Sequence, residues 1–256
     1  MRRPAARADN SINAMPSIDE VLTGIRAQLR AAADPAHREG VRRFFTEDDG
    51  RTVDPYGVRT ADLRPIIQST YQSIRSWPAA QRNRLCNELW KSGKMEEGVL
   101  VCHVYRRFAS QCARCEFQLF SRWLDRFVDN WAHCDGVASW LLAASIANQP
   151  ALVEELFAWT SAKNRWRRRA AAVALLQEAK HGRQTEAVLR MAERLRRDPD
   201  VMVQKGVGWL LKVAYPKRPD AVVSYLTERA AETPRLVLRY AAEKMTPADR
   251  RSVLQR

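Results

Sequence analysis

The chain has few glycines and no long apolar run, and each of these absences excludes a class of protein. Only 10 of its 256 residues are glycine, and runs of β-branched residues are short and rare, so no segment favours a strand. No apolar run approaches the roughly 18 residues of a membrane-spanning helix, and we expect no membrane partner. The segment Met1–Asn13 carries arginines but lacks the apolar core of a secretory signal. We interpret residues 1–15 as a disordered leader, with Met15 as an alternative start.

Cysteine and the familiar catalytic motifs are also sparse. The five cysteines are an odd number, which argues for reduced thiols and a cytoplasmic protein. Cys112 and Cys115 form a CxxC pair without a second pair near it. Zinc needs four ligands, so we expect no metal site. The sequence also lacks a Walker loop, a Rossmann glycine fingerprint and a Ser-His-Asp arrangement. We expect no cofactor.

Positive charge is what the chain has in excess. Lys and Arg number 43 against 29 Asp and Glu, which gives a net charge of +14 and an isoelectric point near 10.1. Such an excess indicates a poly-anionic partner. Nucleic acid is the first candidate; an anionic membrane surface is the second, and it is not the partner that we predict. A basic surface without a partner is the alternative. The apolar fraction of 46% is that of a globular protein.

The apolar spacing predicts helices throughout. Ser17 and Glu20 match a capping box, which predicts a helix that ends near Ala33. Asp34-Pro35 begins a second, short helix, followed by a loop over Thr46–Tyr56, and Thr60 caps a third helix. Further helices are predicted around Leu85–Trp90 and over Met95–Phe108, Cys115–Val128, Val137–Ala147, Leu152–Thr160 and Trp166–Ala179.

Prolines fall between these segments, where a helix can begin but not continue. The pattern is about a dozen helices of roughly 10–17 residues in series, typical of antiparallel helix pairs stacked in a solenoid. The predicted fold is therefore all-α. It is an α-solenoid of HEAT-like helix pairs with a concave basic face, and it forms a single domain over residues 16–256.

Three short segments place aromatic side chains beside charged ones. Trp131 and Asp135 are four residues apart and share a helical face. Between Lys163 and Arg169 five of seven residues are basic and none is acidic, and a buried-looking Ala-rich stretch follows. Arginines at the first turn of a helix oppose the macrodipole, so we expect an external anion such as phosphate to compensate them. A solvated helix face is the alternative.

The third segment is Gln204–Trp209. Lys205, Trp209 and Lys212 share a helical face. Gly206 and Gly208 would each weaken this helix by about 1 kcal/mol relative to alanine. We expect that cost to be offset by close approach of either a neighbouring helix or a ligand.

Together these segments resemble the AlkD-like alkylpurine DNA glycosylases, a family built from HEAT-like repeats. Trp131-x-x-x-Asp135 resembles the family's tryptophan and catalytic aspartate. Trp166-Arg167-Arg168-Arg169 resembles its Trp-x-x-Arg element, and Gln204-Lys205-Gly206-x-Gly208-Trp209 resembles its Gln-Lys-Ala-x-Gly-Trp element. Gly206 stands where the family has alanine.

The resemblance implies a monomeric DNA glycosylase that excises N3- or N7-alkylated purines from double-stranded DNA. It implies catalytic roles for Asp135, Trp131 and Trp209, and a cleft that leaves the damaged base stacked and tolerates bulky adducts. We assign DNA contacts to five basic residues in or next to the second and third segments: Arg165, Arg168, Arg169, Lys205 and Lys212. Two alternatives stay open: a HEAT-like DNA-binding module without catalysis, and a scaffold for an acidic protein.

Overall fold

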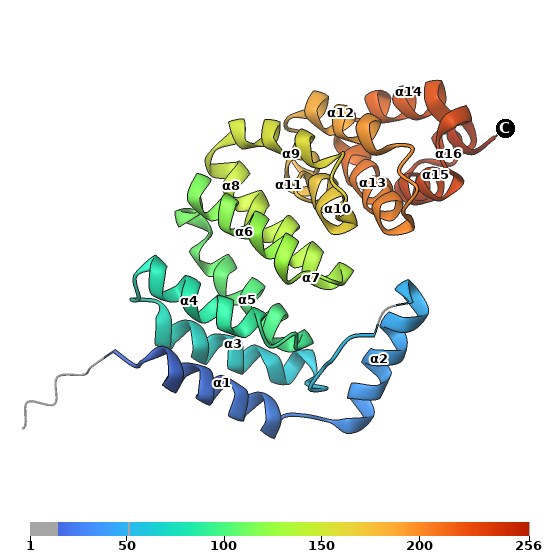
Figure 1. Cartoon of the computed structure of the whole chain (residues 1–256). Helices are drawn as coiled ribbons and strands as arrows, with labels where there is room; N and C mark the ends of the chain where they lie inside the picture. The colour runs from blue at the N-terminus through green and yellow to red at the C-terminus, as the bar shows by residue number, and fades with distance from the viewer. Residues whose placement is uncertain (1–14, 51, 256) are drawn as a thin grey trace, which may run out of the picture.

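The helices follow one another in a curved stack. A computed structural model of the chain describes residues 15–50 and 52–255, and Figure 1 shows its helices arranged in chain order around an open curve. Over the described residues there is no strand, and the single β pairing is an isolated bridge between Asp54 and Lys94. The predicted all-α solenoid is confirmed. Residues 1–14 of the predicted leader lie outside the described residues.

The helices of the first half lead from α1 to α8. Their bounds are α1 (Ile18–Ala31), α2 (Pro35–Asp49), α3 (Thr60–Ile74), α4 (Ala79–Trp90), α5 (Met95–Tyr105), α6 (Arg114–Arg126), α7 (Trp131–Gly136) and α8 (Ala143–Asn148). A 3₁₀ segment (Arg106–Gln111) follows α5, and a π-helical segment (Val137–Leu142) joins α7 to α8.

The helices of the second half are on average shorter. They are α9 (Val153–Trp159), α10 (Arg165–Val173), α11 (Leu176–Lys180), α12 (Thr185–Leu195), α13 (Val201–Ala214), α14 (Pro219–Arg229), α15 (Arg235–Ala241) and α16 (Pro247–Leu254). Short 3₁₀ turns lie at Pro150–Leu152, Tyr215–Lys217, Ala230–Glu232 and Ala242–Lys244.

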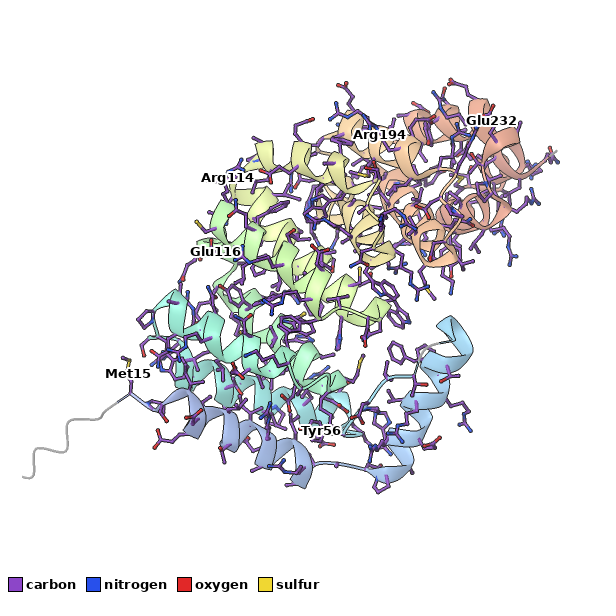
Figure 2. All side chains as sticks on the ribbon, viewed as in Figure 1. Met15, Tyr56, Arg114, Glu116, Arg194 and Glu232 are labelled. Carbon is purple, nitrogen blue, oxygen red and sulfur yellow. The ribbon has the colours of Figure 1, made fainter. Side chains whose placement is uncertain are left out.

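One row of helices forms the inner layer of the stack. Helices α3, α5, α7, α10, α13 and α15 contact one another in that order, and α7, α10, α13 and α15 line the inner side of the curve in Figure 1. Helices α9, α12 and α14 lie on the outer side, where Figure 2 labels Arg114, Arg194 and Glu232. A continuous core of buried apolar side chains runs between the two layers, as expected for a solenoid in which each repeat covers its neighbour.

Local sequence signals explain most helix ends, with three corrections. The capping box is present: Ser17 Oγ accepts from the Glu20 amide at 3.2 Å, and Glu20 Oε2 accepts from the Ser17 amide at 2.7 Å. Helix α2 continues to Asp49, so the loop predicted from Thr46 was wrong over its first residues; Gly50, with a φ of 67°, ends the helix. Thr60 is the first residue of α3 rather than its cap.

The third correction is the predicted helix Trp166–Ala179, which is two helices. α10 ends at Val173 and α11 begins at Leu176. Both helices pack against α13. The chain turns at Ala174 and Leu175, which are both fully buried.

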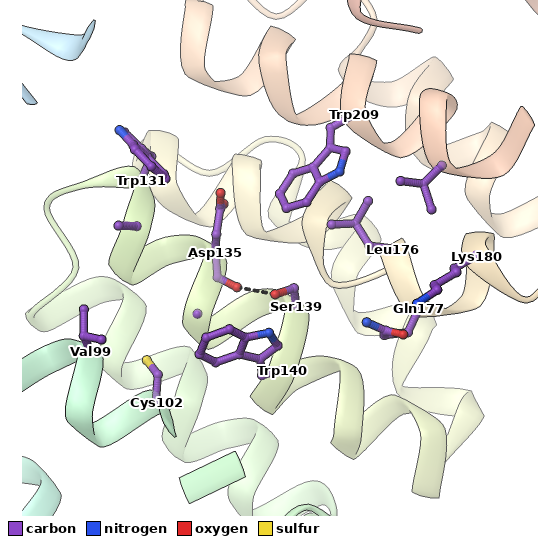
Figure 3. A pocket seen from close by; sticks show the side chains of 13 residues that line it. Val99, Cys102, Trp131, Asp135, Ser139, Trp140, Leu176, Gln177, Lys180 and Trp209 are labelled. Carbon is purple, nitrogen blue, oxygen red and sulfur yellow. Dashed lines mark hydrogen bonds between the residues drawn. The ribbon is translucent and has the colours of Figure 1, made fainter. Parts of the chain in front are cut away.

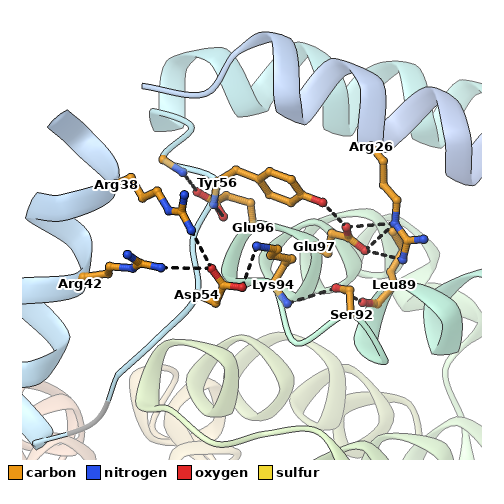
Figure 4. Close-up of polar contacts among 11 residues, drawn as sticks. Arg26, Arg38, Arg42, Asp54, Tyr56, Leu89, Ser92, Lys94, Glu96 and Glu97 are labelled. Carbon is orange, nitrogen blue, oxygen red and sulfur yellow. Dashed lines mark hydrogen bonds and ion pairs between the residues drawn. The ribbon is translucent and has the colours of Figure 1, made fainter. Parts of the chain in front are cut away.

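Two buried carboxylates of α5 hold the chain segment that follows α2 in place against α5 (Figure 4). Glu96 accepts from the backbone amides of Tyr56, Gly57 and Val58 at 2.8, 2.8 and 3.0 Å. The neighbouring Glu97 binds the Arg26 guanidinium and, at 2.7 Å, the Tyr56 hydroxyl. Burial and the contact with Glu97 raise the pKa of Tyr56 to about 12.

Helix α2 is held by a separate ion cluster. Asp54 accepts from Lys94 at 2.6 Å, from Arg38 at 3.2 Å and from Arg42 at 3.5 Å. Its carboxylate is about half exposed, so each pair contributes little by itself. The cluster as a whole connects α2 to α5, and α2 carries the aromatic residues that reach the site described below.

The glycines of α13 allow neighbouring helices to approach closely. A Cβ at Gly208 would lie 2.4 Å from the Tyr240 Cβ and 3.1 Å from the Val237 carbonyl oxygen of α15, and one at Gly206 would lie 3.3 Å from the Arg169 Cγ of α10. Of the two explanations for these glycines, the neighbouring helix is confirmed.

We therefore expect Gly208→Ala to lower the free energy of unfolding by about 1–3 kcal/mol, because overpacking forces α13 and α15 apart. The matched control is Gly24→Ala on α1, where no atom lies within 4 Å of the added Cβ; there, better helix propensity should stabilise by about 0.5–1 kcal/mol. Urea denaturation of both variants measures the difference. Equal effects of the two substitutions would contradict the close approach.

Candidate active site

Asp135 projects from the short helix α7, which is anchored at its start. The Asn130 side chain caps α7 by accepting from the His133 amide at 3.0 Å. His133 is buried, with Nδ1 3.0 Å from Asn130 Nδ2 and Nε2 2.9 Å from the Met95 carbonyl oxygen. These partners favour the tautomer with a proton on Nε2, and burial lowers the pKa of His133. Its imidazole connects α7 to α5.

The Asp135 carboxylate is paired with Arg169 of α10. Arg169 Nε donates to Asp135 Oδ1 at 2.9 Å and Nη2 donates to Oδ2 at 2.8 Å, while Nη1 donates to the Met202 carbonyl oxygen of α13 at 2.5 Å. The two side chains are 15% and 7% exposed. Burial raises the pKa of Asp135, and the guanidinium opposes that shift. The pair fixes the carboxylate plane and connects three helices of the inner row.

A cavity of about 490 Å³ opens beside this carboxylate. Figure 3 shows Asp135 between Trp131 of α7 and Trp209 of α13, so the structure brings together the three residues predicted to be catalytic. The residues lining the cavity are Val99, Cys102, Trp131, Ala132, Asp135, Gly136, Ser139, Trp140, Leu176, Gln177, Lys180, Trp209 and Val213.

Two aromatic side chains of α2 pack against Trp131. The Phe45 ring stacks on it with a centroid distance of 5.3 Å and an interplanar angle of 19°, and Phe44 meets it edge-on at 6.2 Å. Phe45 is buried, whereas Phe44 is 54% exposed. Both phenylalanines lie between Pro35, where the second helix was predicted to begin, and the loop predicted from Thr46, and no sequence pattern indicated that this helix would meet Trp131.

The arginines at the start of α10 are compensated within the chain. Arg168 binds Asp198 through Nε at 2.6 Å and Nη2 at 3.2 Å, and Arg165 binds Asp200 at 3.4 Å. Arg167, to which we gave no role, pairs with Asp125. This differs from the external anion that we expected, because acids from the segment before α13 reach the same helix end. Phosphate contacts by Arg165, Arg168 and Arg169 stay predictions.

The two predicted lysines of α13 do not line the cavity. Lys212 Nζ lies 2.7 Å from Glu243 and 5.6 Å from the centre of the Tyr240 ring. Lys205 is partly buried on the same helix. The lysine that does line the cavity is Lys180, at the end of α11, which the motifs did not indicate.

Trp140 and Ser139 are further cavity residues that the sequence analysis did not assign to the site. In a regular α-helix Trp140, five residues after Asp135, would point to another face. The π-helical segment Val137–Leu142 has more residues per turn, and it brings Trp140 round beneath Asp135 (Figure 3). The Ser139 hydroxyl donates to the Asp135 carbonyl oxygen at 2.7 Å.

The described part of the chain contains no cluster of His, Cys, Asp and Glu side chains able to hold a metal ion. Cys112 of the CxxC pair is buried and Cys115 is exposed. None of the helices in the described ranges combines the length and apolar character needed to span a membrane.

Fold and site together define a helical-repeat protein with a carboxylate and tryptophans on its inner face. A family model described as "DNA alkylation repair enzyme" matches residues 25–245, and the chain belongs to this family. Membership supports a role in the repair of alkylation damage, with DNA as partner.

Among solved structures, the fold is similar to one described as a predicted DNA alkylation repair enzyme from Enterococcus faecalis. The TM-score is 0.74 at 14% identity, and the similarity covers 84% of this chain and 97% of the other. No match was found among curated protein sequences.

The buried pair predicts a strong and non-additive effect on stability. Asp135→Ala leaves the Arg169 guanidinium buried without its carboxylate, and we expect a loss of about 3–5 kcal/mol. In the double variant Asp135→Ala/Arg169→Leu the uncompensated charge is gone, so the loss should be smaller than the sum of the two single losses. Guanidinium chloride denaturation of the four proteins measures the coupling. Additive losses would show that the pair does not act as a unit.

Proposed function

We propose that this protein is a DNA glycosylase that hydrolyses the N-glycosidic bond of positively charged N3- or N7-alkylated purines in duplex DNA. The observation that supports this best is the placement of Asp135. Its carboxylate is held rigidly by Arg169 at the wall of a cavity, between the indoles of Trp131 and Trp209.

The chemistry requires little more than such a carboxylate. An alkylated purine already carries a positive charge and is a good leaving group, so departure needs no general acid. As the bond breaks, the sugar develops positive charge at C1′, which a nearby carboxylate stabilises. Each Asp135 oxygen accepts one hydrogen bond from Arg169 and keeps a lone pair with which to orient a water molecule.

The tryptophans and basic residues complete the proposal. Trp131 and Trp209 would pack against the deoxyribose, and their faces favour the developing cation. Arg169 donates three hydrogen bonds within the described chain, which leaves two of its five N–H groups for a phosphate beside the lesion. Arg165, Arg168, Lys205 and Lys212 would contact phosphates further along the duplex. We propose that the protein acts as a monomer in the cytoplasm without flipping the base.

A second candidate function is binding of DNA without catalysis. It is favoured by one observation: the Asp135 charge is already compensated by Arg169. A neutral pair stabilises a sugar cation less than a free carboxylate would.

Release of 7-methylguanine from duplex DNA separates these functions. We expect the wild type to release the base, and we expect Asp135→Asn to lower the rate at least 100-fold, because the amide keeps the shape but not the charge. The measurement is chromatography of the released base under single-turnover conditions. The matched control is Asp125→Asn, whose carboxylate binds Arg167 in a separate surface hollow and should leave the rate unchanged.

Two results would overturn the proposal. Absence of release by the wild type from N3- and N7-methylated DNA would leave the binding function. Equal release by Asp135→Asn would remove Asp135 as the catalytic group. Asp135→Asn keeps Arg169 and removes one negative charge, so it should bind duplex DNA at least as tightly as the wild type.

The phosphate contact is tested by salt dependence. For Arg169→Met we expect weaker duplex binding and a slope of log K against log salt that is shallower by about one unit. Arg194→Ala is the control, because Arg194 is exposed on the outer side of the curve and should not change the slope. Fluorescence anisotropy from 50 to 200 mM salt provides both slopes. An unchanged slope for Arg169→Met would place Arg169 outside the DNA interface.

A further inference from the structure

Ion pairs on the outer side of the stack connect each outer helix to the next one along the chain. Glu154 of α9 binds Arg190 of α12 at 2.6 Å, and Glu193 of α12 binds Arg229 of α14 at 2.9 Å. None of these side chains lines the cavity beside Asp135. We call the following set of pairs the outer ladder: Arg114–Glu155, Glu154–Arg190, Glu193–Arg229 and Arg196–Glu232.

Three pairs of the outer ladder join residues that are 36 positions apart in the sequence. A single solenoid repeat has about 20–45 residues, so this constant spacing corresponds to one structural repeat. Successive repeats therefore bring an acid and an arginine to equivalent positions on the outer surface. Pairs that recur with this period connect α9, α12 and α14 in the same way.

Two arginines of the outer ladder have further partners. The Arg190 guanidinium also lies 3.7 Å from the centre of the Phe157 ring of α9. The Arg196 side chain is 9% exposed, and it binds Glu193 at 3.1 Å as well as Glu232 at 3.0 Å. An isolated exposed ion pair contributes little to stability, but a network of charges with fixed geometry contributes more. The outer ladder can therefore hold neighbouring repeats together.

The inner and outer layers differ in how neighbouring repeats meet. In the inner row, Gly206 and Gly208 bring α13 into close contact with α10 and α15, and such packed contacts are nearly incompressible. On the outer side a hollow of about 520 Å³ lies between α12 and α14, and Glu193 and Arg229 are among the residues that line it. The inner row therefore acts as a fulcrum, whereas ion pairs span the space between the outer helices.

We propose that the outer ladder is a brace that sets the angle between successive repeats and keeps the two arms of the curve apart. Because the inner contacts are fixed, any widening of the outer gaps increases the angle between repeats and closes the curve. Intact ion pairs oppose this widening, so that a polymer can enter between the arms. The brace is a property of the free protein and does not depend on the function proposed above.

The distance between the arms tests the brace in the full chain. Helices α1 and α16 lie on opposite arms of the curve (Figure 1), and Ala27 of α1 and Ser252 of α16 are exposed. Spin labels on Ala27→Cys and Ser252→Cys report the distance by double electron–electron resonance. The background carries Cys115→Ser, because the other four cysteines are buried and are not labelled.

Two variants break the outer ladder from opposite sides of its pairs. If each outer gap widens by about 1 Å across layers about 10 Å apart, each repeat turns by about 6°. Three such turns should shorten the distance between the labels by about 5 Å in both variants. The variants are Glu154→Gln/Glu193→Gln/Glu232→Gln and Arg190→Gln/Arg229→Gln.

Net charge separates the brace from general repulsion. The first variant removes three negative charges and the second removes two positive charges, so repulsion alone would lengthen the distance in the first and shorten it in the second. The charge-swapped protein Glu154→Arg/Arg190→Glu keeps its pair and should keep the wild-type distance. Glu186→Gln, on an exposed residue of α12 outside the outer ladder, should keep it too. Any result other than shortening in both ladder variants overturns the brace.

Discussion

The contact between Asp135 and Arg169 is the interaction on which the arrangement of the site depends. Taking both charges out of water is costly, and only their mutual attraction in good geometry offsets it. The Arg169 guanidinium donates two hydrogen bonds to the Asp135 carboxylate and a third to the Met202 carbonyl oxygen. Helices α7, α10 and α13 therefore meet at this one cation. The same contact aims the carboxylate at the cavity. Stability and the proposed chemistry therefore depend on the same atoms.

Close packing between helices places the rest of the site. Gly206 and Gly208 let α13 approach α10 and α15 more closely than larger residues would allow, and this sets the position of Trp209 opposite Asp135. On the other side, Phe45 of α2 stacks under Trp131. Helix α2 is in turn held to α5 by the Asp54 cluster. Each wall of the cleft is thus fixed by a neighbour distant in sequence.

The fold and the shared helical face of Trp131 and Asp135 could be predicted from sequence because they depend on local patterns, whereas the grouping of Asp135 with Trp209 was predicted only from the family resemblance. Apolar spacing and Ser17-Glu20 give helices, and a four-residue spacing gives Trp131 and Asp135 a common face. What the arginines bind depends on which acids arrive from other helices, and sequence spacing does not contain that information. Trp140 could not be assigned to the site from a regular helical period, because a π-helical segment changes that period. Phe45 was missed because α2 crosses to α7 only in three dimensions.

The placement of the site on successive helices of one row has a mechanical consequence. Asp135, Arg169 and Trp209 belong to α7, α10 and α13, so no single repeat contains the cleft. In a solenoid each repeat is rotated slightly against the next, and these rotations add up to the curvature. The width of the cleft therefore depends on the superhelical pitch, because bending the whole stack of repeats moves Trp209 toward or away from Trp131.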